Sequence, residues 1–290
     1  MRFVELFSGI GGFAEAAAAA GHEVVAAVDH DRRAQLVYGA NFTHRQEVKN
    51  LASVRGGWLT SLGADGWWMS PPCAPHGVRG NRADLDDPRS SALRRLLELL
   101  PEVRPRVVAL ENVPGFAGSQ AHAAVVAATE AAGLPHRAER EICPTELGIP
   151  GVRRRFYLVA SRDPLTVGPP PRVELHLRDV LGPDRDELEV PEEVLQRFGG
   201  ALHRVDPDDD RPIAACFTRA YGTSPVYAGS YLQRGGRVRY FAPEEIARLH
   251  GHSPGFGFAG LSARDGWKLV GNGLSVPVVR HVLSWISTET

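Results

Sequence analysis

The chain has 290 residues, of which 43% are hydrophobic and 23% are charged. These proportions are ordinary for a soluble globular protein, and the length suffices for one large domain or for a main domain with a smaller satellite. The formal net charge is −1, which excludes a strongly basic surface. Any nucleic-acid partner would therefore have to be held by local basic patches.

The cysteines and the N-terminal residues indicate the class of compartment. Cys73, Cys143 and Cys216 are an odd number of cysteines and form no CxxC spacing, so neither a disulfide framework nor a zinc site is expected. The first residues lack a basic segment followed by an apolar run, and no apolar stretch is long enough to span a bilayer. We expect a cytoplasmic protein without a metal and without membrane contact.

The first half of the chain alternates apolar strands with helices. Strands are predicted at residues 2–7, 23–28, 67–69, 107–110 and 156–160. Helices are predicted between them at residues 13–20, 90–100 and 121–132. This alternation favours an α/β fold with a mostly parallel, doubly wound sheet that is covered by helices on both faces.

The alternation is lost after residue 162. Residues 163–237 contain many prolines and glycines and an acidic run at 206–210. We therefore expect a first domain at 1–162, a small irregular domain at 163–237, and a C-terminal segment at 238–290 that returns to the first domain. Helices are predicted in this last segment at 243–249 and 276–286.

A glycine-rich turn, Phe7-Ser8-Gly9-Ile10-Gly11-Gly12, connects the first predicted strand to the first helix. Glycines at such a turn let the backbone approach a cofactor closely. Asp29 follows about 20 residues after Gly9, at the end of the next strand, where a carboxylate can accept ribose hydroxyls. Taken alone, the pattern fits a nicotinamide-dependent oxidoreductase or a purely structural turn equally well.

A second motif, Ser70-Pro71-Pro72-Cys73, follows the predicted strand at 67–69. The two prolines restrict the backbone and present Cys73 on a stiff loop at the carboxyl end of the strand. Open α/β sheets bind their ligands at that edge, so Cys73 is a candidate nucleophile. The alternative is a buried core cysteine.

Two further sets of charged residues accompany predicted strands. Glu111 follows the strand at 107–110 and is expected at the same sheet edge as Cys73, although a solvated glutamate is an alternative. Arg153, Arg154 and Arg155 precede the strand at 156–160. In an extended chain Arg153 and Arg155 point to one side and Arg154 to the other, although such a run can also be a solvated face.

The order and spacing of these motifs resemble the cytosine-5 methyltransferase family over nearly the whole chain. Residues 7–12 are similar to its first cofactor motif, Pro71-Pro72-Cys73 to its nucleophile loop, and Glu111-Asn112-Val113 to its acid motif. Arg153 and Arg155 match its alternating arginines, and residues 240–254 and Gly271-Asn272 match its C-terminal motifs.

The resemblance implies a Rossmann-like, S-adenosyl-L-methionine-dependent methyltransferase with a small target-recognition domain at 163–237. The implied catalytic residues are Cys73, Glu111, Arg153 and Arg155. The implied cofactor contacts are Phe7, Gly9, Ile10, Gly11, Gly12, Asp29, His30, Asn50, Pro72 and Asn272.

Several stretches resemble the branch of the family that methylates the anticodon loop of tRNA. They include Cys216-Phe217-Thr218 and Arg239-Tyr240-Phe241. The sequence departs from the family pattern at Ala74, His76, Gly151, His252 and Gly273, none of which is a candidate catalytic group.

The residue types suit this chemistry, because carbon 5 of cytosine is a poor nucleophile until a thiolate adds to carbon 6. Glu111, if it is protonated or shares a proton, can hydrogen-bond ring N3 and the exocyclic amine. Arg155 can donate to O2, and Arg153 can help to place the nucleotide. The short, arginine-poor segment 182–210 favours tRNA over a specific duplex DNA site. A DNA cytosine-5 methyltransferase, possible in a restriction system, is the main alternative, and a catalytically silent RNA-binding module is another.

Overall fold

The structure is a computed structural model that describes residues 1–72 and 87–286. The chain divides into two compact units. Unit 1 comprises Met1–Ile142, Arg154–Pro169 and Val279–Thr290, and unit 2 comprises Cys143–Arg153 and Pro170–Val278. These boundaries differ from the expected ones, because 143–153 and 238–278 belong to the second unit and not to the first.

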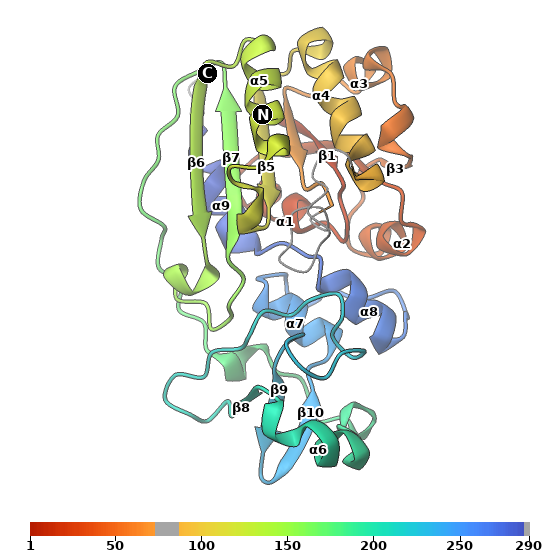
Figure 1. The fold of residues 1–290 in the computed structure, drawn as a ribbon, viewed down its shortest axis with the longest axis vertical. Coiled ribbons are helices and arrows are strands. Elements are labelled where there is room, and N and C mark those ends of the chain that lie inside the picture. The colour runs from red at the N-terminus through yellow and green to blue at the C-terminus, as the bar shows by residue number, and fades with distance from the viewer. Residues whose placement is uncertain (73–86, 287–290) are drawn as a thin grey trace. The chain divides into compact units, whose positions relative to one another are not determined.

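Unit 1 is built on a seven-stranded sheet in the order β3-β2-β1-β4-β5-β7-β6 (Figure 1). The strands are β1 Arg2–Leu6, β2 Glu23–Asp29, β3 Gln46–Val48, β4 Gly66–Met69, β5 Val107–Asn112, β6 His136–Ile142 and β7 Arg155–Ser161. Among these strands only β7 runs antiparallel to its neighbours, β5 and β6. The expected mostly parallel sheet is confirmed.

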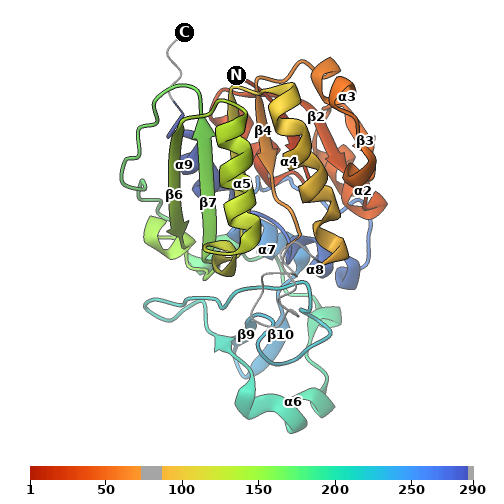
Figure 2. The ribbon, with the colours of Figure 1, turned by 45° about the horizontal axis from the view of Figure 1, so that its top comes forward.

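Helices cover both faces of this sheet, as a doubly wound fold requires. They are α1 Gly12–Ala19, α2 Arg32–Asn41, α3 Gly56–Ser61, α4 Ser91–Val103, α5 Gln120–Ala131 and α9 Val276–Leu283. Figures 1 and 2 show α4 and α5 in front of the sheet, whereas α1 and α9 lie behind it. Side chains of alternate strand residues therefore face two different helical layers.

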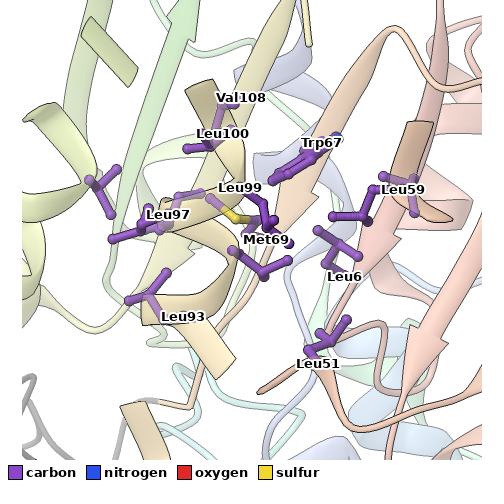
Figure 3. Packing of buried hydrophobic residues seen from close by; sticks show 14 of the residues in the cluster. Leu6, Leu51, Leu59, Trp67, Met69, Leu93, Leu97, Leu99, Leu100 and Val108 are labelled. Atoms are coloured by element: carbon purple, nitrogen blue, oxygen red, sulfur yellow. The ribbon is translucent and has the colours of Figure 1, made fainter. Parts of the chain in front are cut away.

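A hydrophobic core lies between the sheet and α4 (Figure 3). Leu6 of β1, Met69 of β4 and Val108 of β5 are fully buried there. From α4, a stripe of leucines spaced at three and four residues enters the same cluster, including Leu93 and Leu100. Each buried leucine contributes about 1.5–3 kcal/mol, so this layer fixes the positions of the strand ends.

The opposite face of the sheet carries an aromatic layer under α1. Phe13 of α1 stacks on Trp68 of β4 with ring centroids 4.8 Å apart. Phe3 of β1 packs edge-on against Phe13 at 5.5 Å. All three aromatic side chains are buried. Their packing fixes the first turn of α1, which directly follows the glycine turn.

Several elements differ from the sequence expectation. The last helix ends at Leu283 and not at residue 286, because the chain closes there in short turns such as Trp285 N–H to the Val282 carbonyl. Four elements of unit 1, α2, α3, β3 and β6, were not predicted. The edge strand β6 alternates charged, exposed residues with half-buried ones, so it lacks the apolar run of a central strand.

Unit 2 holds a small three-stranded sheet in the order β10-β9-β8. Its elements are β8 Arg204–Val205, β9 Tyr231–Arg234, β10 Arg237–Tyr240, α6 Glu192–Phe198, α7 Pro243–Leu249 and α8 Ala263–Val270. The helix predicted at 243–249 is confirmed as α7. A compact aromatic cluster, formed by Phe217, Tyr221, Tyr231, Tyr240, Phe241 and Trp267, occupies its interior.

Candidate active site

The glycine turn leaves β1 and enters α1 through three residues with left-handed backbone. Phe7 has φ +61°, Gly9 has φ +54° and Gly11 has φ +92°. Ser8 N–H donates to the Val28 carbonyl at 3.0 Å, which ties the turn to β2. Two glycines and one strained phenylalanine thus bend the chain sharply at the carboxyl end of the first strand.

Asp29 at the end of β2 holds the glycine turn in place. Its Oδ2 accepts from Gly9 N–H at 2.8 Å, and its Oδ1 accepts from Asp31 N–H at 2.9 Å. The ring Nδ1 of His30, which is largely exposed, lies 3.4 Å from Oδ1. The carboxylate therefore helps to order the turn, a role that the sequence did not indicate because its two partners are backbone amides.

The two glycines Gly9 and Gly11 of the turn differ in how closely other atoms surround them. A Cβ atom at Gly9 would meet nothing within 4 Å, whereas a Cβ atom at Gly11 would lie 2.3 Å from the ring of Phe42. The turn is thus open at Gly9 and tightly packed at Gly11. An open glycine beside a fixed carboxylate is what the expected cofactor requires, because its ribose and sulfonium must approach the backbone closely.

A buried polar network supports the turn from below. Tyr38 OH donates to Glu5 Oε2 at 3.1 Å and lies 3.0 Å from His44 Nδ1. Gln35 Nε2 donates to Ser8 Oγ at 3.0 Å, from α2 to the turn itself. Burial raises the pKa of Glu5 to about 8, so its side chain is largely protonated at neutral pH.

The other expected cofactor residues lie in varied settings. Ile10 is buried, and Gly12 is the first residue of α1. Asn50 caps a short 3-10 turn by accepting from Ala52 N–H at 3.0 Å. Pro72 is exposed at the end of the described β4 segment, and Asn272 is an exposed residue of unit 2. Their cofactor roles stay predictions.

The segment that leads to Cys73 is fixed at the end of β4, although Cys73 itself lies outside the described residues. Ser70 N–H donates to the Leu6 carbonyl at 3.3 Å, and Ser70 Oγ accepts from Trp68 Nε1 at 2.9 Å. Asn112 Nδ2 donates to the Pro71 carbonyl at 3.2 Å. The strand end is therefore held from both neighbouring strands, β1 and β5.

Glu111 and Arg155 come together at this edge of the sheet. Glu111 is on β5, and Arg155 begins the adjacent antiparallel strand β7. Arg155 Nε lies 3.2 Å from Glu111 Oε1, and both side chains are mostly buried. The ion pair fixes a carboxylate and a guanidinium next to Asn112, which holds the Pro71 segment.

Arg153 has contacts of another kind, although it shares a sequence motif with Arg155. It is only 4% exposed. Its Nη1 donates to the Phe217 carbonyl at 3.1 Å, and its Nη2 donates to the Gly271 carbonyl at 3.2 Å. The side chain thus braces two distant segments of unit 2, a role for which the sequence contains no signal.

In residues 1–72 and 87–286, no group of three or more histidine, cysteine or acidic side chains is arranged to hold a metal ion. Over the same residues, no helix has the length and apolar character needed to cross a bilayer. Of the two described cysteines, Cys143 is buried and Cys216 is half-buried, and both are free thiols.

Comparison with known proteins agrees with this architecture. The family model "C-5 cytosine-specific DNA methylase" matches residues 1–196. The chain is 30% identical to the tRNA (cytosine(38)-C(5))-methyltransferase of Schizosaccharomyces pombe, over 98% of this chain and 96% of the relative. It is 25% identical to the type II methyltransferase M.HhaI of Haemophilus parahaemolyticus, over 97% and 93%. The crystal structure of the Schizosaccharomyces pombe Dnmt2 methyltransferase superposes with a TM-score of 0.88 at 29% identity, covering 98% of this chain and 97% of that one.

Proposed function

The chain belongs to the C-5 cytosine-specific DNA methylase family, and from that premise we propose that it methylates carbon 5 of cytosine in the anticodon loop of tRNA. The proposal assigns the covalent step to Cys73, the contacts to the cytosine ring to Glu111 and Arg155, and the methyl donor to S-adenosyl-L-methionine.

The first chemical step is addition of the Cys73 thiolate to carbon 6 of cytosine. A sulfur–carbon bond forms, the carbon 5–carbon 6 double bond breaks, and its electron pair makes carbon 5 nucleophilic. S-adenosyl-L-methionine, when bound, would supply the electrophilic methyl group for that carbon, with its sulfur–methyl bond broken and S-adenosyl-L-homocysteine as the leaving group. A base then removes the proton from carbon 5, the double bond re-forms, and the thiolate leaves.

Negative charge builds on the ring when the thiolate adds, and fixed donors stabilise it. Arg155 can donate to O2 of the cytosine while its Nε stays next to the Glu111 carboxylate. Glu111, when it carries a proton, can then donate to ring N3 and accept from the exocyclic amine. The Arg155 contact orients this carboxylate before the substrate arrives, which reduces the reorganisation needed in the transition state.

The glycine turn is the proposed cofactor site within unit 1. Gly9 provides open backbone, and Asp29 provides carboxylate oxygens next to it. Because both Asp29 oxygens already accept from backbone N–H groups, ribose hydroxyls would share these oxygens through their second lone pairs. Phe7, with its left-handed backbone, is positioned by the same turn.

One observation carries the proposal more than any other: the buried Glu111–Arg155 ion pair at the end of β5, where the adjacent Asn112 holds the Pro71 carbonyl of the segment that follows β4. A nicotinamide oxidoreductase has no use for this combination. The tRNA substrate rests on the full-length similarity to tRNA (cytosine(38)-C(5))-methyltransferases. An anticodon loop also offers unpaired bases, so the target base needs little energy to leave its stack.

The DNA alternative keeps the same chemistry and changes the substrate. The similarity to M.HhaI supports it, since that relative is a type II methyltransferase. The short region between β7 and β9 argues against it. Direct readout of a duplex requires several base-edge contacts in the major groove, and a short region can offer few of them. We also propose a cytoplasmic location, where tRNA is available and a thiol nucleophile stays reduced.

The test is methyl transfer from labelled S-adenosyl-L-methionine by the purified protein. Total tRNA and duplex DNA are offered in separate reactions, and bisulfite sequencing then locates the modified cytosine. We expect label in tRNA at one anticodon-loop cytosine and none in DNA. Label in DNA with none in tRNA would move the assignment to the DNA branch of the family.

A further inference from the structure

Tyr227 stands out in unit 2 by exposure and by backbone conformation. Its side chain is 81% exposed, more than that of any other exposed large hydrophobic residue in the described chain. Its φ is +62°, a left-handed value that is costly for an aromatic residue. Strain of this kind persists only where the surrounding structure enforces it, and it is concentrated at functional sites.

The loop that carries Tyr227, residues 218–228 (the Tyr227 loop), is held by several hydrogen bonds. Thr218 N–H donates to the Ala228 carbonyl at 2.9 Å and closes the loop at its base. Tyr231 OH donates to the Pro225 carbonyl at 2.8 Å, and Tyr221 OH donates to the Ser230 carbonyl at 2.6 Å. These bonds hold the backbone on both sides of Tyr227, so its ring is presented from a fixed support.

Buried aromatic rings form the floor of this loop and leave no space for rearrangement. A Cβ atom at Gly222 would lie 2.2 Å from the Trp267 ring. A Cβ atom at Gly229 would lie 2.6 Å from the ring of Phe217 and 2.7 Å from that of Tyr221. The loop therefore packs on the aromatic cluster through its glycine backbone, while the side chain of Tyr227 is 81% exposed.

The charge around Tyr227 suits a polyanion. Between residues 212 and 233 the sequence has one charged side chain, the exposed Arg219, and no carboxylate. The neighbouring hairpin differs, because Arg234 pairs with Asp208 at 3.2 Å and Arg237 pairs with Asp186 at 2.8 Å. The Tyr227 loop is thus free of the acidic groups that would repel phosphate.

The residue before the Tyr227 loop, Phe217, is hydrogen-bonded to Arg153 of the family motif. Arg153 donates to the Phe217 carbonyl, one residue before Thr218 closes the loop. The same guanidinium reaches the Gly271 carbonyl, and a Cβ at Gly271 would lie 2.4 Å from Arg219 N. A motif arginine, the Tyr227 loop and the end of α8 are therefore one connected piece of unit 2.

We propose that Tyr227 is a base-stacking residue that contacts an unpaired nucleobase of the RNA substrate, with Arg219 binding a phosphate of the same strand. This inference rests on the proposed RNA substrate. An exposed aromatic ring on a rigid support, in a segment (residues 212–233) whose sequence has one cation and no carboxylate, suits stacking on single-stranded bases.

The test measures binding of a fluorescein-labelled anticodon stem–loop RNA to the full chain by fluorescence anisotropy. The variants are Tyr227→Gly and Tyr227→Phe, with Ile213→Ala as a matched control at another exposed apolar residue of unit 2. Stacking on a base contributes enough that removal of the ring should weaken binding by roughly tenfold. Tyr227→Phe and Ile213→Ala should bind as the wild type does.

Thermal unfolding separates this role from a structural one. Glycine adopts the left-handed backbone without strain, so Tyr227→Gly should melt at or above the wild-type temperature while binding RNA more weakly. Lower stability together with unchanged RNA affinity would assign Tyr227 to folding and overturn the inference. Equal weakening by Ile213→Ala, or no RNA binding by the wild type, would also overturn it.

Methyl transfer by the wild type is measured in parallel, so that the two proposals can fail separately. If the wild type methylates tRNA and Tyr227→Gly binds it equally well, only the stacking inference is wrong. If the wild type transfers no methyl group to RNA yet binds it in a ring-dependent manner, the proposed function is wrong and the stacking role stands.

Discussion

At the scale of single residues, Arg153 and Arg155 belong to one short motif but make different contacts. Arg155 pairs with a carboxylate on β5, whereas Arg153 donates to two backbone carbonyls of unit 2. A guanidinium suits both tasks because it presents several donors in a fixed plane. Replacement of Arg155 is therefore expected to affect mainly catalysis, and replacement of Arg153 mainly stability.

We predict that Arg155→Gln lowers kcat by about 10²–10³-fold, because it removes a donor to the charged ring, and that it also lowers stability, because Glu111 loses its buried ion-pair partner. Arg153→Met should instead destabilise the protein by about 1–3 kcal/mol, since the Phe217 and Gly271 carbonyls lose their partner. Steady-state kinetics and urea unfolding of each variant measure the two effects.

Arg154→Gln serves as the control for both variants, because its position in the motif lies between them. It should change kcat and stability less than either. If Arg153→Met unfolded at the wild-type urea concentration and only its kcat fell, the bracing role would be wrong.

A second residue-scale prediction concerns Cys73, the candidate nucleophile. Cys73→Ala should abolish methyl transfer and leave cofactor binding intact, because no other group can add to carbon 6. Cys216→Ala is the matched control, since its half-buried thiol lies in unit 2 and has no assigned chemical step. Single-turnover assays with labelled donor decide, and substantial turnover by Cys73→Ala contradicts the assignment.

The sequence indicated some of these residues and not others, for a physical reason. Glu111 and Arg155 could be placed at the sheet edge because strand ends follow from apolar runs. The bracing role of Arg153 could not, since its partners are carbonyls 64 and 118 residues away in sequence. A carbonyl is present at every residue, so no residue type marks such a contact.

At the scale of elements, the glycine turn depends on what packs against it. Gly11 has φ +92°, and a Cβ there would lie 2.3 Å from the ring of Phe42. We predict that Gly11→Ala destabilises the protein by more than about 1 kcal/mol and weakens cofactor binding, through backbone strain and steric overlap. Thermal unfolding and calorimetric titration measure the two losses.

Gly57→Ala is the control for that substitution. Gly57 lies exposed within α3, and a Cβ there would meet nothing within 4 Å. Alanine is a better helix former than glycine, so this variant should be slightly more stable than the wild type. A Gly11→Ala variant that gained stability in the same way would show that the turn is not constrained.

A pH prediction follows from the buried carboxyl of β1. Burial raises the pKa of Glu5 from 4.5 to about 8, so the unfolded chain loses this proton at a lower pH than the folded protein. The contribution of Glu5 to stability is therefore complete below pH 4.5 and is lost progressively as pH rises toward 8. Glu5→Gln should flatten this part of the profile, because an amide does not ionise.

Urea unfolding at intervals from pH 5 to pH 8 measures that change. Glu23→Gln is the control, since Glu23 lies on the neighbouring strand β2 with an exposed side chain. Its profile should follow that of the wild type. A Glu5→Gln profile as steep as that of the wild type would mean that another group causes the pH dependence.

Element prediction from sequence succeeded where the pattern was apolar and failed where it was polar. β5 is buried at all six residues and was predicted, although the structure extends it to Asn112. β6 alternates exposed charged residues and was missed, because its stability comes from seven paired residues of β7. α2 was missed as well, since its first two residues are exposed arginines and its buried positions include the polar Gln35.

At the scale of the whole molecule, charge is balanced locally as well as globally. The chain has 33 basic and 34 acidic residues. Several arginines of unit 2 are matched to carboxylates, such as Arg239 to Glu245 at 2.9 Å and Arg185 to Glu244 at 3.0 Å. Guanidinium groups paired in this way contribute little to phosphate binding, so the proposed RNA recognition by unit 2 would depend mainly on stacking and shape.

This balance predicts a weak salt dependence of tRNA binding. Each phosphate neutralised by a protein cation releases counterions, and the slope of log K against log salt is about −0.7 per contact for single strands. Because residues 212–233 hold a single charged side chain, that of Arg219, we expect a slope no steeper than about −3, as measured by anisotropy titrations over a range of salt concentrations. Arg219→Gln should make the slope shallower by about one contact, whereas Arg237→Gln should leave it unchanged, since Arg237 is paired with Asp186. A steep slope that is insensitive to Arg219 would mean that phosphate binding uses another surface of the protein.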